Sequence, residues 1–98
     1  MVYSLTDKLK FTEPPKIEIN GKVLTINNSA VNVLKLMDIV ETDGEIAGTK
    51  AVLELLFNAK DRKIIESLDL SMEDFVTFCT ACMELAVGND PDSAESER

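Results

Sequence analysis

Two cysteines are the residues in this chain whose spacing first suggests chemistry. Cys79-Thr-Ala-Cys82 matches the C-x-x-C pattern of redox-active and zinc-binding pairs. A redox pair of this kind lies at a helix N-terminus, where the helix dipole lowers the thiol pKa. Here the pair falls inside an apolar helical pattern, and the chain has no histidine and no second cysteine pair to complete a zinc site. We interpret both cysteines as core residues and expect no metal site.

Two glycine-containing patterns approach known ligand-binding loops. Residues 44–50, GEIAGTK, are one residue short of the phosphate-binding pattern GxxxxGK[ST], and they place the threonine before the lysine. Gly44 also fits the sixth position of a calcium loop, but Ile39 and Lys50 would then stand at the first and twelfth ligand positions. Neither side chain supplies a suitable oxygen. We expect no nucleotide and no calcium ion.

Ser67, in residues 66–70 (ESLDL), resembles the prosthetic-group serine of acyl carrier proteins, which are also small, acidic and helical. In that fold the serine opens a helix and further helices follow, whereas Ser67 is expected to close a short helix. The absence of histidine removes Ser-His-Asp and Cys-His catalysis. The adjacent carboxylates are explained by helix N-termini or by the tail. We expect neither an enzyme nor a cofactor.

The amino-acid composition excludes several further classes of protein. The chain has 98 residues and a net charge of -8, so it accommodates one domain and lacks the basic surface that nucleic-acid binding requires. No apolar run reaches the ~18 residues of a membrane span, and the N-terminal sequence lacks a secretory signal pattern. With 45% hydrophobic residues, the chain is too apolar to be disordered. A cytoplasmic protein with reduced thiols is expected.

The elements that position these residues begin with an arm, 1–15, that ends at a Pro-Pro pair. Its sequence leaves open whether it pairs as a strand or docks on a neighbouring molecule. Residues 16–27 predict a β-hairpin, because Asn20-Gly21 favours a type I′ turn. In that register Ile17 pairs with Leu24, and one face is apolar: Ile17, Ile19, Leu24 and Ile26.

Helical patterns follow the hairpin. The first runs from a cap at Asn28-Ser29 to about Glu41. Its inner stripe is predicted to be Ala30, Val33, Leu34, Met37 and Val40, with Val31, Leu36 and Ile39 alongside. Gly44 ends it, and a second helix is predicted over about 45–59. Its inner face is Ile46, Leu53, Leu56 and Phe57.

Two more helices are predicted, over 62–67 with Asp61 as the cap and over 72–87 with Ser71 as the cap. Gly88 suits the end of the last helix. Residues 89–98 are acidic and interrupted by proline, and we expect this tail to be disordered. The predicted fold is α+β, mainly α: one domain, 16–88, with an N-terminal β-hairpin packed on a small bundle of three to four helices.

The last helix predicts a partner. Eleven of the sixteen residues from Met72 to Val87 are apolar, and the two predicted helices of 28–41 and 45–59 are also apolar over more than half of their circumference. So small a domain cannot bury all of these faces against one another. We expect the surplus to contact another protein or a second copy of the chain, although one helix could instead be central and fully buried.

The order and character of these elements resemble those of the tail assembly chaperones of long-tailed bacteriophages (siphophages) and related prophages. The resemblance covers about 16–88 and is concentrated in Leu68–Gly88, with its Leu-Asp-Leu entry, its Ser71 cap and its long apolar run. It implies a non-catalytic chaperone that coats the tape measure protein, recruits tail-tube subunits and is absent from the mature virion. Many members also have a longer, frameshifted form. A small helical adaptor or regulatory module is the alternative.

The expected partner-binding residues follow from helix geometry. The last helix has two apolar faces, and the face formed by Phe78, Cys82 and Leu85 is predicted to bind the partner. The apolar residues of the arm, Leu5, Leu9 and Phe11, are predicted to contribute. On this interpretation the chain forms a homo-oligomer, and Phe78→Asp abolishes assembly but leaves a folded monomer.

Overall fold

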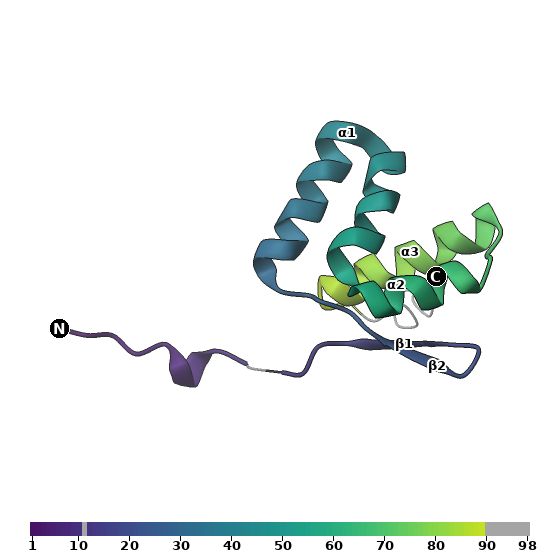
Figure 1. Cartoon of the computed structure of the whole chain (residues 1–98). Coiled ribbons are helices and arrows are strands. Elements are labelled where there is room, and N and C mark those ends of the chain that lie inside the picture. The colour runs from purple at the N-terminus through teal and green to yellow at the C-terminus, as the bar shows by residue number, and fades with distance from the viewer. Residues whose placement is uncertain (11, 90–98) are drawn as a thin grey trace, which may run out of the picture.

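The computed structural model describes residues 1–10 and 12–89. A single 3-10 turn in the arm (η1, Thr6–Lys8) precedes two strands, β1 (Lys16–Ile19) and β2 (Lys22–Thr25). Three helices follow: α1 (Ala30–Leu56), α2 (Ala59–Ser67) and α3 (Met72–Ala86). The predicted α+β, mainly α fold is confirmed, with the hairpin lying beneath the helices and the arm projecting away from them (Figure 1).

The hairpin forms in the predicted register. Ile17 pairs with Leu24 and Ile19 with Lys22, while Asn20 and Gly21 both adopt the positive φ that the two-residue turn requires. Leu24 and Ile26 are fully buried, and Ile17 and Ile19 pack against the same core. The alternation along the strands therefore selects the face that meets the helices.

Helix α1 is two helical segments joined at Gly44, where φ is 93° and ψ is -179°. Only glycine adopts this backbone conformation at low cost, so the first helical segment ends here as predicted, and the chain also folds back at this residue. Residues 30–43 and 45–56 stand side by side (Figure 1), and Asn32 Nδ2 donates to the carbonyl of Leu55 at their lower end. Ser29 caps the first segment by accepting from the N–H of Asn32.

The inner stripe predicted for the first segment is wrong in part. Leu34 and Met37 are exposed, whereas Leu36 is only 2% exposed. The pattern of apolar residues there is nearly continuous around the helix, so its period alone did not select the face that packs against the second segment. Ile46, predicted to face inward on the second segment, is likewise exposed.

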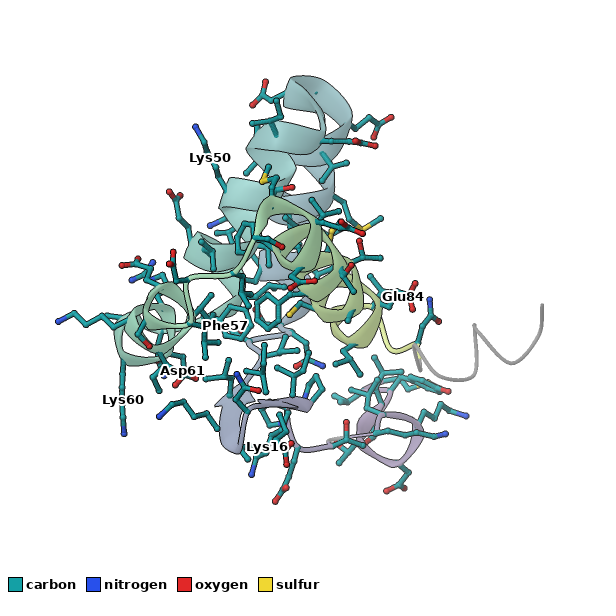
Figure 2. The ribbon with its side chains drawn as sticks, turned by 90° about the vertical axis from the view of Figure 1, so that its right-hand side faces the viewer. Lys16, Lys50, Phe57, Lys60, Asp61 and Glu84 are labelled. Atoms are coloured by element: carbon teal, nitrogen blue, oxygen red, sulfur yellow. The ribbon has the colours of Figure 1, made fainter. Side chains whose placement is uncertain are left out.

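Asp61 does not cap α2. Asn58 is the N-cap and accepts from the N–H of Asp61, and the Asp61 carboxylate instead accepts from the N–H of Thr25 at 3.2 Å. In Figure 2 the side chain of Asp61 lies between α2 and the hairpin. Asp61, which was expected to cap α2, therefore links α2 to strand β2 through a hydrogen bond.

Helix α3 begins at Met72 as predicted and ends at Ala86, one residue before the predicted end. The hydroxyl of Ser71 accepts from the N–H of Asp74, and Gly88 follows the helix with a φ of 93°. A single core cluster lies between the hairpin and the helices, and Phe57 points into it (Figure 2). The buried residues are Leu24, Ile26, Val33, Leu36, Ala51, Val52, Leu56, Phe57, Ile65, Phe78, Cys79, Cys82 and Ala86.

The tail predicted to be disordered lies, from residue 90 onward, outside the described residues. Among the residues that the structure does describe, no helix is both long enough and apolar enough to cross a membrane.

Candidate protein-binding groove

An apolar groove of about 690 Å³ separates α3 from the upper part of α1. On the α3 side its lining residues recur every three or four positions, so they form one stripe along the helix. The opposite wall comes from the region where α1 folds back on itself. The lining residues are Val40, Glu45, Ile46, Gly48, Thr49, Lys50, Met72, Phe75, Val76, Cys79, Thr80, Met83 and Glu84.

A second hollow of about 520 Å³ extends the first along α3. The two share Val40, Met83 and Glu84, and the second adds Met37, Glu41 and Val87. We call the combined surface the α1–α3 groove. It follows α3 from Met72 to Val87, about 22 Å at the rise of an α-helix, which is the length of a four-turn helix.

Much of the lining of this groove consists of exposed apolar side chains. Ile46 is 73% exposed, Met72 67% and Val76 45%, and Met37 and Val87 are about half exposed. Isolated exposed apolar residues are ordinary, but a contiguous set around one depression marks an interaction surface. Three of the four methionines of the chain line the groove, and their flexible thioethers adapt to different apolar partners.

The charges at the groove are mostly negative. Glu41, Glu45 and Glu84 line it, and Lys50 is the one basic residue among its lining residues in the described chain. Figure 2 shows Lys50 and Glu84 on opposite sides of the view. An apolar channel with an acidic rim is complementary to an amphipathic helix whose apolar stripe is bordered by Lys or Arg.

The structure corrects the predicted partner-binding face of α3. Phe78 is 6% exposed and Cys82 0%, so neither is available to a partner in the folded chain. The ring of Phe78 stacks on that of Phe57 with centroids 5.8 Å apart, and Leu85 is half-buried against the same core. The other apolar face of α3, which includes Met72 and Val76, is the one that lines the groove.

The face of α3 that lines the groove is recognisable in the sequence as an apolar stripe, although the other face was predicted to be the partner-binding surface. Met72, Phe75, Val76, Cys79 and Met83 form the other apolar stripe of α3, and the presence of two methionines among them is the one local signal that sets it apart. No comparable sequence pattern indicates that α1 forms the opposite wall of the groove, because that wall depends on how α1 folds back at Gly44.

The predicted arm residues Leu5 and Leu9 are exposed, as is Tyr3, and every residue of 1–10 is exposed. Phe11 lies outside the described residues. The only backbone hydrogen bonds within this described part of the arm are local, from Lys8 to Leu5 and from Leu9 to Thr6.

The cysteines do not form a reactive pair. Both are free thiols, and burial raises the pKa of Cys79 to about 11. Burial, with a smaller contribution from Cys79, raises the pKa of Cys82 to about 12. Both thiols are therefore protonated at neutral pH and are poor nucleophiles and metal ligands. Within the described residues no three cysteine or acidic side chains are grouped closely enough to hold a metal ion.

Comparison of the chain with family models, with curated proteins and with solved structures returns no match. The groove therefore has to be interpreted from its own geometry and chemistry.

Proposed function

We propose that this protein is a non-catalytic binding protein that holds an amphipathic helical segment of a partner in the α1–α3 groove. The observation that carries the proposal is the set of exposed apolar residues that lines two adjoining hollows, which together follow α3 for the length of a four-turn helix. Burial of those side chains supplies the binding free energy, and the acidic rim favours a helix with basic edges.

The more specific proposal is a phage tail assembly chaperone. The resemblance to that family is strongest in Leu68–Gly88, and this segment contains the whole α3 wall of the groove. The partner would then be the tape measure protein, with recruitment of tail-tube subunits as a second role. Such a protein acts in the cytoplasm of the bacterial host and is absent from the mature virion.

Co-expression with the tape measure protein of the same phage or prophage tests this proposal. The wild-type chain should keep the tape measure protein soluble and co-purify with it. Val76→Asp places a charge on the apolar wall and should weaken binding by at least about tenfold, the equivalent of ~1.4 kcal/mol. Val76 is 45% exposed, so the substitution should leave the fold intact.

Thr77→Asp is the matched control. It adds the same charge at the neighbouring exposed position of α3, which does not line the groove. Circular dichroism should show that both variants are folded. Equal binding by Val76→Asp and Thr77→Asp would exclude the groove, and failure of the wild-type chain to bind would exclude the tape measure protein as the partner.

The alternative is an adaptor that binds one fixed partner through the same groove. A groove of four helical turns accommodates a single helix, which is the observation that favours it. Stoichiometry separates the two functions. A chaperone that coats a long helical protein binds in many copies, whereas an adaptor forms a complex of one to one.

A further inference from the structure

We infer that the arm, residues 1–10, of one copy of this chain docks in the α1–α3 groove of a second copy. The inference rests on the groove proposed above as the binding site, but it concerns a different occupant. It makes the free protein a self-associating one, in which the groove is covered until a partner helix displaces the arm.

The apolar side chains of the arm are exposed, as expected for a segment that packs against another molecule. Leu5 and Leu9 flank the single turn of η1, and both are about half exposed, with Tyr3 67% exposed. Figure 1 shows the arm extending away from its own helices. Residues 1–10 thus present apolar side chains to the surroundings instead of to the core of their own chain.

The chemistry of the arm is complementary to that of the groove. Leu5 and Leu9 are the two cap residues of η1, so both apolar side chains lie within one short exposed segment. Residues 1–10 contain two lysines, Lys8 and Lys10, and one acid, Asp7, which gives a net charge of +1. The groove lining contains three acids and one lysine, a net charge of -2. Apolar contacts and opposite charges therefore favour the same pairing.

Such a contact is heterologous, because the surface that donates differs from the surface that accepts. Each copy carries one arm and one groove, so the contacts either close into a ring or extend into an open chain. A copy without a functional groove and a copy without a functional arm can still form one contact. This property makes the inference testable with full-length chains.

The experiment uses sedimentation equilibrium over the micromolar range. Val76→Asp disables the groove, and Leu5→Gln with Leu9→Gln disables the arm without changing its charge. The matched controls are Thr77→Asp on α3 and Ser4→Gln with Thr6→Gln in the arm, which alter neighbouring exposed positions. All ten residues of the arm are exposed, so the arm variants should remain folded.

The wild-type chain and both controls should associate, and the groove and arm variants should each be monomeric, with self-association weakened at least about tenfold. An equimolar mixture of the groove variant and the arm variant should restore a heterodimer. A wild-type chain that stays monomeric overturns the inference. So does a mixture that stays monomeric, which is the result expected if the arm docks on its own chain.

The two proposals fail separately. The arm variant keeps its groove, so it should bind a partner helix whether or not the arm docks in trans. Partner binding by the arm variant without wild-type self-association would overturn only the present inference. Restored heterodimers without any partner binding would overturn only the proposed function.

Discussion

Val40 and Gly48 face each other across the two side-by-side segments of α1, and a Cβ atom at position 48 would lie 2.5 Å from Cγ2 of Val40. Both residues line the α1–α3 groove, so this close approach also sets the shape of its wall. Valine has little rotamer freedom in a helix, and its methyl group cannot easily move aside. Glycine at position 48 is therefore a packing requirement.

The first prediction follows from this contact. Gly48→Ala should destabilise the wild-type chain by about 1–3 kcal/mol, because the added methyl overpacks against Val40. In a Val40→Ala background the same substitution should stabilise by about 0.5–1 kcal/mol, since alanine is the better helix former. Urea unfolding of the four chains measures this double-mutant cycle. Equal effects in both backgrounds would show that the two residues are not coupled.

The second prediction concerns Phe78, whose ring lies between those of Phe57 and Phe75 at centroid distances of 5.8 and 6.5 Å. Phe78→Ala should lower the free energy of unfolding by about 3–5 kcal/mol, and Phe78→Asp should prevent folding. Val76→Ala, on the exposed side of the same helix, should cost less than about 1 kcal/mol. A folded, monomeric Phe78→Asp variant would restore the original assignment of this residue to the partner surface.

The third prediction concerns pH. The pKa values of Cys79 and Cys82 are raised by burial from 9.0 to about 11 and about 12. Well below pH 9 both thiols are protonated in the folded and unfolded chains and add no pH dependence. Between about pH 9 and pH 12 the unfolded chain releases these protons first, so the free energy of unfolding falls as the pH rises.

Denaturation at several alkaline pH values measures that decline, and a Cys79→Ala/Cys82→Ala chain should show a smaller one. Labelling with a thiol reagent at neutral pH provides an independent measurement. The native chain should react slowly and the urea-unfolded chain rapidly, because the buried thiols are neither ionised nor accessible. Rapid labelling of the native chain would contradict the burial of this pair.

The fourth prediction concerns the Thr25 N–H, which donates to the Asp61 carboxylate at 3.2 Å. Asp61→Ala should cost about 1–3 kcal/mol, because it removes a charged acceptor and leaves the strand N–H without its partner. Asp61→Asn keeps an acceptor oxygen and should cost less. Amide hydrogen exchange at Thr25 should accelerate more in the alanine variant, and unchanged exchange would show that the bond contributes little.

Local chemistry was sufficient to predict the hairpin and the ends of several helices. Asn20-Gly21 determines the turn and hence the strand register, because few other residue pairs adopt positive φ at both positions. Ser29 and Ser71 cap their helices through a hydrogen bond to an N–H three residues ahead. Gly44 reverses the chain for an equally local reason. Each of these features depends on neighbours in the sequence.

The inward face of each helix was decided only by the tertiary structure. Helix α3 is apolar on two sides, so its sequence pattern is compatible with either side facing inward. Stacking of Phe78 on Phe57 places one side in the core and leaves Met72 and Val76 at the groove. The role of Asp61 likewise depends on Thr25, 36 residues away. Periodicity shows that a helix has an apolar face, but when most of the helix is apolar, only the packing of distant segments determines which face is buried.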